Sequence, residues 1–204
     1  MYALVFRTFI AAAIISVLGA CSTEKASSPD RTASEQLLIS AAADRAANNL
    51  DLKVVKGTKV FIDTEYFEGT DSKYALSAIR ASLLRQGAAI VSDRKDAQAV
   101  VELRAGALSI DETNTLVGVP SFAIPIPLAG RFDTPEIALF KRTERKGVAK
   151  FAAHSYGVAD GKLMHSTPPK FGYAHKRDWV VLLFISWKTS DLPSEKDDGV
   201  LEEW

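Results

Sequence analysis

The residues of this 204-residue chain that could carry catalytic chemistry are few and widely spaced. Asp63 and Glu65 are alternate residues, and paired carboxylates of this kind serve hydrolases as acid and base. The histidines are His154, His165 and His175, and none shows the His-x-His or His-x-x-x-His spacing that presents two imidazoles to one metal ion. We therefore expect no metal site, no cofactor and no enzymatic activity, and keep a hydrolase built from these residues as an alternative.

The single cysteine, Cys21, follows a segment with the features of an export signal. Arg7 is the only charged side chain among residues 1–20, and the apolar run from Phe9 to Leu18 has ten residues. A helix needs about 20 apolar residues to cross a bilayer, so this run has the size of a signal-peptide core. The small residues Gly19 and Ala20 fit a peptidase groove, which predicts cleavage between Ala20 and Cys21.

The sequence Leu18-Gly19-Ala20-Cys21 resembles the lipobox of bacterial lipoproteins. The resemblance implies that the signal is removed before Cys21, that its thiol carries a diacylglycerol, and that the new N-terminus is usually acylated. Each buried CH₂ of such chains contributes about 0.8 kcal/mol, so the bilayer is the expected partner. Ser22, in place of Asp, resembles outer-membrane sorting, with the inner membrane or cell surface as alternatives. A plain secretory signal with an incidental cysteine is the other interpretation.

Composition and charge limit the remaining function classes. The chain is 47% hydrophobic and 25% charged, which indicates a globular domain. Lys plus Arg equals Asp plus Glu at 25 each, so the basic excess of a nucleic-acid-binding protein is missing. No glycine-rich loop joins a strand to a helix, which disfavours nucleotide binding.

The expected organisation is one α+β domain over residues 34–190, with two helices packed on a largely antiparallel sheet. It follows the signal peptide (1–20) and a flexible tether with the lipidated cysteine (21–33). Residues 191–204 carry six acids and one lysine, which indicates a disordered tail.

The pattern predicts helices over about 33–49 and 72–86. Thr32 and Glu35 have capping-box spacing, Asp71 is a cap for the second helix, and Gly87 is its stop. Strands are predicted over 58–63, 88–92 and 99–110, with the first and third adjacent. Two further strands, 135–143 and 147–158, are predicted to form a hairpin around residues 144–146. A tight turn at Asp160-Gly161 is predicted to lead into another strand from residue 162, which is interrupted at 167–169. Residues 179–187 are predicted to form one buried strand.

Residues 113–130 are almost entirely apolar yet contain Pro120, Pro125 and Pro127, which a central strand tolerates poorly. One interpretation is an irregular connection packed over the domain. The other is a protruding apolar loop that docks on a partner or dips into a bilayer. Its candidate contact residues are Val117, Val119, Phe122, Ile124 and Ile126.

A basic cluster comprises Lys141, Arg142, Arg145 and Lys146, at the predicted hairpin tip. It is either a solvated tip with lysines that discourage strand pairing, or a contact for anionic lipid headgroups or lipopolysaccharide. The aromatic residues Tyr173, Trp179 and Trp187 could line a sugar- or peptide-binding face, although packing within the sheet is the default.

Residues 134–187 are similar in style to uncharacterised bacterial lipoproteins, through PEIALFK, GVAKF, the Asp-Gly-Lys turn at 160–162 and the final WVVLLF segment. The 58–110 unit also resembles periplasmic modules of envelope assembly lipoproteins and of the curli-secretion lipoprotein family, in which amphipathic hairpins build an oligomeric pore. These likenesses imply a non-enzymatic binding or assembly role with an unknown envelope protein, and an oligomeric secretion or pore component as the alternative.

Overall fold

The computed structural model describes residues 31–53, 56–126 and 130–193, without the side chain of Ile126. The predicted signal peptide, its cleavage site at Ala20 and the lipid-bearing Cys21 lie outside the described residues, as do residues 194–204 of the predicted tail.

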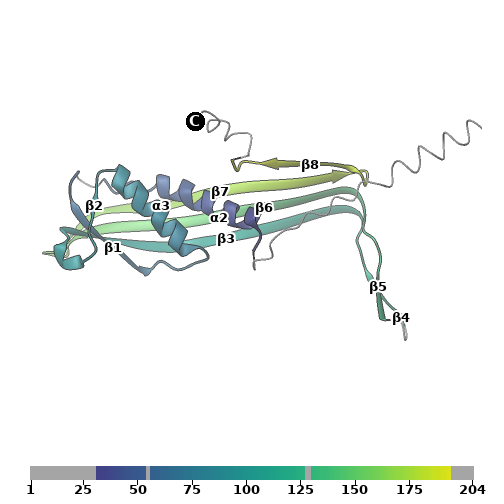
Figure 1. Ribbon diagram of the computed structural model, residues 1–204, viewed down its shortest axis with the longest axis horizontal. Helices are drawn as coiled ribbons and strands as arrows, with labels where there is room; N and C mark the ends of the chain where they lie inside the picture. Colours follow the sequence, from purple (N-terminus) through teal and green to yellow (C-terminus); the bar gives the residue numbers. More distant parts are fainter. Residues whose placement is uncertain (1–30, 54–55, 127–129, 194–204) are drawn as a thin grey trace, which may run out of the picture. The chain divides into compact units, whose positions relative to one another are not determined.

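Two α-helices and eight strands make up the described domain (Figure 1). In chain order they are α2 (Ala33–Asn48), β1 (Lys59–Tyr66), α3 (Ser72–Arg85), β2 (Ala89–Ile90), the 3₁₀ turn η2 (Arg94–Asp96), β3 (Ala99–Val119), β4 (Ala123–Ile126), β5 (Gly130–Asp133), β6 (Ile137–Gly157), β7 (Leu163–Val181) and β8 (Ile185–Ser190).

Six of the strands form one sheet in the order β2-β1-β3-β6-β7-β8. β1 is parallel to β2 and to β3, whereas the pairs from β3 to β8 are antiparallel. The predicted adjacency of the first and third strands is thus confirmed. β4 and β5 form a two-stranded ribbon that continues the β3–β6 hairpin. Figure 1 shows α2 and α3 on one face, with β3, β6 and β7 running on beyond the helices. We call the opposite face the open face.

Helix α2 begins with the predicted capping box, in which the Thr32 hydroxyl accepts from the Glu35 amide and the Glu35 carboxylate accepts from the Thr32 amide. Its apolar side packs on β6 and β7 at a backbone distance that only glycine permits. A Cβ atom on Gly172 would lie 1.9 Å from the Ala42 carbonyl oxygen, and one on Gly147 would lie 2.3 Å from that of Leu38. Two glycines therefore fix where α2 lies.

Helix α3 packs beside α2 and buries Ala75, Ile79 and Leu83. Asp71 occupies the predicted N-cap position, but its backbone is left-handed with φ of 58° and its carboxylate makes no capping hydrogen bond. The helix ends before Gly87, whose φ of 97° is the left-handed conformation expected at a stop.

The predicted hairpin around residues 144–146 is wrong, because β6 runs unbroken from Ile137 to Gly157. The charged residues that indicated a turn are paired with neighbouring strands. Glu144 accepts from Arg177 of β7 at 2.7 Å, and Arg145 donates to Glu112 of β3 at 2.6 Å. Cross-strand ion pairs of this kind stabilise a strand where the sequence alone indicates a turn.

Three further predictions differ from the structure in the same region. Most of the segment 113–130 is strand or ribbon rather than an irregular connection, since β3 extends to Val119. β7 continues through Pro168-Pro169, which fall at a register shift opposite Ala152. The predicted strand 179–187 is the end of β7, a turn at 182–184 and the start of β8. The turn at Asp160-Gly161 is confirmed.

A bulge at Gly106 sets which side chains of β3 face the helices. Before it, Leu103 pairs with Ala153, and the odd-numbered Val101 and Leu103 belong to the core cluster. After it, Leu108 pairs with Ala149, and the even-numbered Leu108 and Ile110 contribute to the core. One extra residue thus exchanges the two faces of the strand.

Candidate functional site

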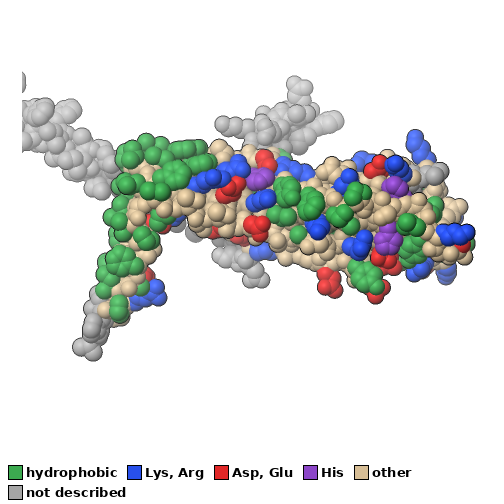
Figure 2. Space-filling view, turned by 180° about the vertical axis from the view of Figure 1, so that it is seen from behind, with side chains coloured by type: hydrophobic (Ala, Val, Ile, Leu, Met, Phe, Trp, Pro, Cys, Tyr) green, Lys and Arg blue, Asp and Glu red, His purple; other side chains and the backbone are tan. Residues whose placement is uncertain are grey.

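Exposed apolar side chains are concentrated at one end of the described sheet, where the turn between β7 and β8 lies beside the start of β6. The turn between β7 and β8 bonds to the start of β6: the Leu182 amide donates to the Leu139 carbonyl at 2.9 Å and the Leu183 amide to that of Ala138 at 3.1 Å. Figure 2 shows apolar side chains gathered at this end of the sheet and along the ribbon. We call this set the apolar end; it comprises Val117, Val119, Phe122, Ile124, Phe132, Ile137, Leu139, Leu182, Leu183, Phe184 and Ile185.

Every member of the apolar end has between 41% and 79% of its surface exposed, and Phe184 is the most exposed. Four of the five predicted contact residues, Val117, Val119, Phe122 and Ile124, belong to it; the side chain of Ile126 lies outside the described part. The predicted loop is therefore not packed over the domain. The sequence does not indicate the contribution of residues 182–185, because their apolar run predicts a buried strand.

The β7–β8 turn holds two leucines in a conformation that favours other residues. The φ angles of Leu182 and Leu183 are 51° and 73°. Glycine or asparagine adopts this left-handed region more readily, and a residue with a Cβ is destabilised there by about 1–2 kcal/mol. The turn thus carries exposed apolar side chains at an energetic cost to the fold.

Two tryptophans stand beside the apolar end on the open face. Trp179 of β7 and Trp187 of β8 are register partners, and their rings stack with centroids 5.8 Å apart. Phe140 meets Trp179 edge-on at 6.0 Å, and the Arg142 guanidinium lies 5.1 Å from the centroid of the Trp179 ring. The faces that the two tryptophan rings turn toward each other are therefore occupied by packing within the sheet and cannot bind a sugar or peptide.

An ion-pair network continues from Arg142 along the open face. Glu144 accepts hydrogen bonds from both Arg142 and Arg177. Burial raises the pKa of Glu144, but the hydrogen bond from Arg177 and the charges of Arg142 and Arg177 outweigh it and hold the pKa below its ordinary value. The carboxylate therefore stays ionised and offsets part of the cationic charge.

The four residues of the predicted basic cluster do not form one patch. Strand alternation places Lys141 and Arg145 on the helix side and Arg142 and Lys146 on the open face. Lys141 pairs with Glu136 at 2.7 Å, and Arg145 pairs with Glu112. The Lys146 ammonium lies 4.4 Å from the ring centroid of Tyr173. The predicted hairpin tip is therefore wrong, and the cluster lies mid-strand among partners.

The candidate hydrolytic residues lie in separate environments. Nε2 of His154 is 3.5 Å from Oε2 of Glu102, and Nδ1 of His175 is 3.4 Å from Oδ2 of Asp191. His165 lines a cavity of about 290 Å³ together with Ser155. The Asp63 carboxylate accepts the Glu65 amide at 3.1 Å within its own strand.

Nothing in the described residues gathers three or more His, Cys, Asp or Glu side chains as a metal site would. Nor is any helix of that part of the chain long and apolar enough to cross a membrane.

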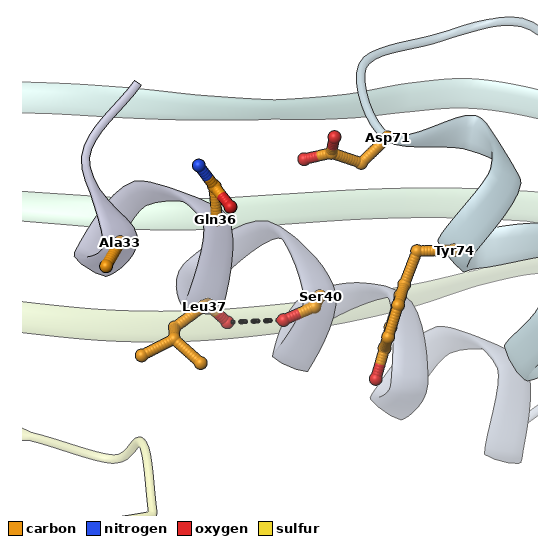
Figure 3. A pocket seen from close by; sticks show the side chains of 6 residues that line it. All are labelled: Ala33, Gln36, Leu37, Ser40, Asp71 and Tyr74. Carbon is orange, nitrogen blue, oxygen red and sulfur yellow. Dashed lines mark hydrogen bonds between the residues drawn. The ribbon is translucent and has the colours of Figure 1, made fainter. Parts of the chain in front are cut away.

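A pocket of about 420 Å³ lies between α2 and the start of α3 (Figure 3). Ala33, Gln36, Leu37, Ser40, Asp71 and Tyr74 line it, and the Ser40 hydroxyl donates to the Leu37 carbonyl at 3.1 Å. The Tyr74 hydroxyl donates to Asp44 at 2.9 Å, and this bond raises the pKa of Tyr74. With Asp71 as its one carboxylate and no histidine or cation, this lining offers little for acid–base chemistry.

A protein-family model matches residues 14–183, which is most of the chain and includes the apolar end except Phe184 and Ile185. The protein belongs to DUF6655, a family of unknown function. None of the curated proteins compared with this DUF6655 member matches it.

Proposed function

We propose that the protein is a lipid-anchored, non-enzymatic lipoprotein of the cell envelope. In this proposal Cys21 holds it in the outer membrane, the domain faces the periplasm, and the apolar end binds another envelope component. The lipobox-like sequence before Cys21 supports the anchor.

The observation that carries the binding role is the exposure of the apolar end. Burying one Leu or Phe side chain contributes about 1.5–3 kcal/mol, so an occupant that covers several of them gains a large favourable term. Monomeric proteins rarely expose large contiguous apolar patches, and those they do expose are often functional. The turn at Leu182-Leu183 strengthens this argument, because it keeps leucines where smaller or polar residues would fit the backbone better.

The anchor is tested by radiolabelled palmitate in cells that produce the native chain or Cys21→Ser. We expect the label on the native chain and its loss in Cys21→Ser, with the protein released from membranes or left unprocessed. Ser22→Ala, which alters the neighbouring residue and keeps the thiol, serves as the matched control and should retain the label. Label that persists in Cys21→Ser would refute the anchor.

The binding role is tested by a photoreactive amino acid at position 184 in intact cells, with position 163 as the control. Phe184, in the turn after β7, and Leu163, the first residue of β7, lie at opposite ends of that strand and are 79% and 66% exposed. We expect adducts from position 184 and few from position 163. Equal labelling of both positions would contradict a specific role for the apolar end.

An oligomeric secretion or pore component is the second candidate, and the strand edges favour it. Within the described residues, β3 beyond Arg104 pairs with β6 alone, and β8 pairs with β7 alone. Unpaired edges of this length are templates for pairing with another chain. Native mass spectrometry of detergent-extracted protein tests this candidate, and a monomer at all concentrations would rule against it.

A further inference from the structure

The open face changes in character, row by row, toward the apolar end. Three successive cross-strand rows follow from the register of β3, β6, β7 and β8. The row nearest the end is Val117, Phe140, Val181 and Ile185; the next is Thr115, Arg142, Trp179 and Trp187; the third is Thr113, Glu144, Arg177 and Thr189. Two residues of a strand span about 6.8 Å, so the face passes from apolar through aromatic to ionic within about 14 Å.

This order matches the layers of a bilayer surface. Apolar side chains suit the acyl region, tryptophan is enriched at the headgroup level, and arginine near it contacts phosphates. The Arg142 guanidinium lies over the Trp179 ring and in the same cross-strand row as the two tryptophans. A surface that binds another folded protein needs a complementary shape, but it does not need its apolar, aromatic and ionic side chains in this graded order.

The direction of α2 is a second, independent observation. The helix begins beside Lys176, whose ammonium donates to the Ser34 hydroxyl at 2.8 Å, and it ends beside Phe171, whose carbonyl accepts from Asn49. Its N-terminus is therefore directed toward the apolar end, about five residues or 17 Å along β7 from Val181. The ten residues 22–31 reach at most about 36 Å when extended, so a lipid on Cys21 and the apolar end can meet one membrane.

We infer that the apolar end inserts into a phospholipid bilayer, with the β7–β8 turn among the acyl chains and Trp179 and Trp187 at the headgroups. This second membrane contact rests on the proposed binding role of the apolar end and is tested separately from the lipid at Cys21. The ribbon would stay nearer the headgroups than the β7–β8 turn, because it carries the exposed ion pair of Arg131 and Asp133, whose charges are disfavoured among acyl chains. Insertion to the depth of one turn resembles that of interfacial helices, which bury about 5–10 Å.

Depth-dependent quenching of tryptophan fluorescence tests this inference. The chain has three tryptophans, so Trp204→Phe leaves only Trp179 and Trp187. Protein extracted from membranes is reconstituted into phosphatidylethanolamine–phosphatidylglycerol vesicles, with or without brominated acyl chains. We expect brominated lipid to quench the emission of the two tryptophans.

Variants at the turn separate insertion from anchoring by lipid. Phe184→Asp places a charge where acyl chains would lie and should abolish the quenching, since a charged residue is strongly disfavoured there. Leu182→Asn/Leu183→Gly, which suits the left-handed backbone, keeps the fold and should also reduce it. Leu163→Asp, at the other end of β7, is the matched control and should leave the quenching unchanged.

The alternative occupants give different results. If brominated lipid failed to quench the tryptophans of Trp204→Phe, the inference of bilayer insertion would be overturned. If Phe184→Asp then abolished a protein adduct, the occupant would be a protein and the proposed binding role would stand. If it converted an oligomer to a monomer, the occupant would be a second copy. If the variants changed neither quenching, adducts nor mass, the proposed binding role would fall as well.

Discussion

Gly172→Ala should displace α2 from the sheet more than the same substitution at any other described glycine. The new Cβ would lie 1.9 Å from the Ala42 carbonyl oxygen and 2.5 Å from the Ala46 nitrogen. Both obstructing atoms belong to the backbone of α2, so no side-chain rotation relieves the overlap.

The structure gives the size of the required movement. Cβ contacts in proteins do not fall below 3.0 Å, so α2 must move from 1.9 Å to at least 3.0 Å, a shift of 1.1 Å. Leu38, Ala42 and Ala46 are each 0% exposed and lose packing when the helix moves. Overpacking a core costs about 1–3 kcal/mol, and the upper value applies because a whole helix moves. For a domain of this size, about 3 kcal/mol lowers Tm by roughly 6–12 °C.

Thermal and urea unfolding of the full chain, followed by far-UV circular dichroism, measures the effect. Gly106→Ala is the matched control, since the nearest atom there, at 2.9 Å, is Cδ of the flexible Lys150 side chain. We expect this control to change the unfolding free energy by less than about 1 kcal/mol. Equal stability of the two variants would refute the claim that Gly172 sets the helix–sheet distance.

Three further variants test other parts of the argument. Thr32→Ala removes the capping box and should lower the unfolding free energy by about 1 kcal/mol, with faster amide exchange in the first turn of α2. Glu144→Gln should cost about 1 kcal/mol at neutral pH after allowance for the partial exposure of Arg142 and Arg177. The folded pKa of Glu144 is lowered, so its contribution to the unfolding free energy is present above the ordinary pKa of 4.5 and is lost as pH falls through the folded pKa. Glu144→Gln lacks this contribution, so its Tm should fall less than that of the native chain as the pH is lowered. Leu182→Asn/Leu183→Gly should raise the unfolding free energy by about 1 kcal/mol or more, and a destabilised variant would mean that the two leucines contribute packing rather than strain.

The sequence predicted the elements whose signals are local. Apolar periodicity and the Thr32–Glu35 box identify α2, and Gly87 marks the end of α3. The β-branched run of β1 and its adjacency to β3 also follow from the pattern.

The later strands are misassigned because their signals depend on partners far along the chain. Glu144 is typical of a turn when read alone, but it lies mid-strand because Arg177, 33 residues later, pairs with it. Leu182 and Leu183 give no turn signal, since glycine and asparagine usually occupy left-handed positions. The candidate residues of the 113–130 segment were found from composition, whereas the rows that join them to Trp179 and Trp187 require the cross-strand register.

The bulge at Gly106 limits how this protein can change its reach. Deleting one residue from β3 between the bulge and Val119 would turn the side chains beyond the deletion toward the wrong face, moving Val117 to the helix side. Removing two residues from each of β3, β6 and β7 would keep every side chain on its present face of the sheet. The part of these strands that extends beyond the helices would become shorter by about 7 Å. The distance between the helices and the apolar end can therefore change only in steps of two residues, each about a quarter of the thickness of a hydrocarbon layer.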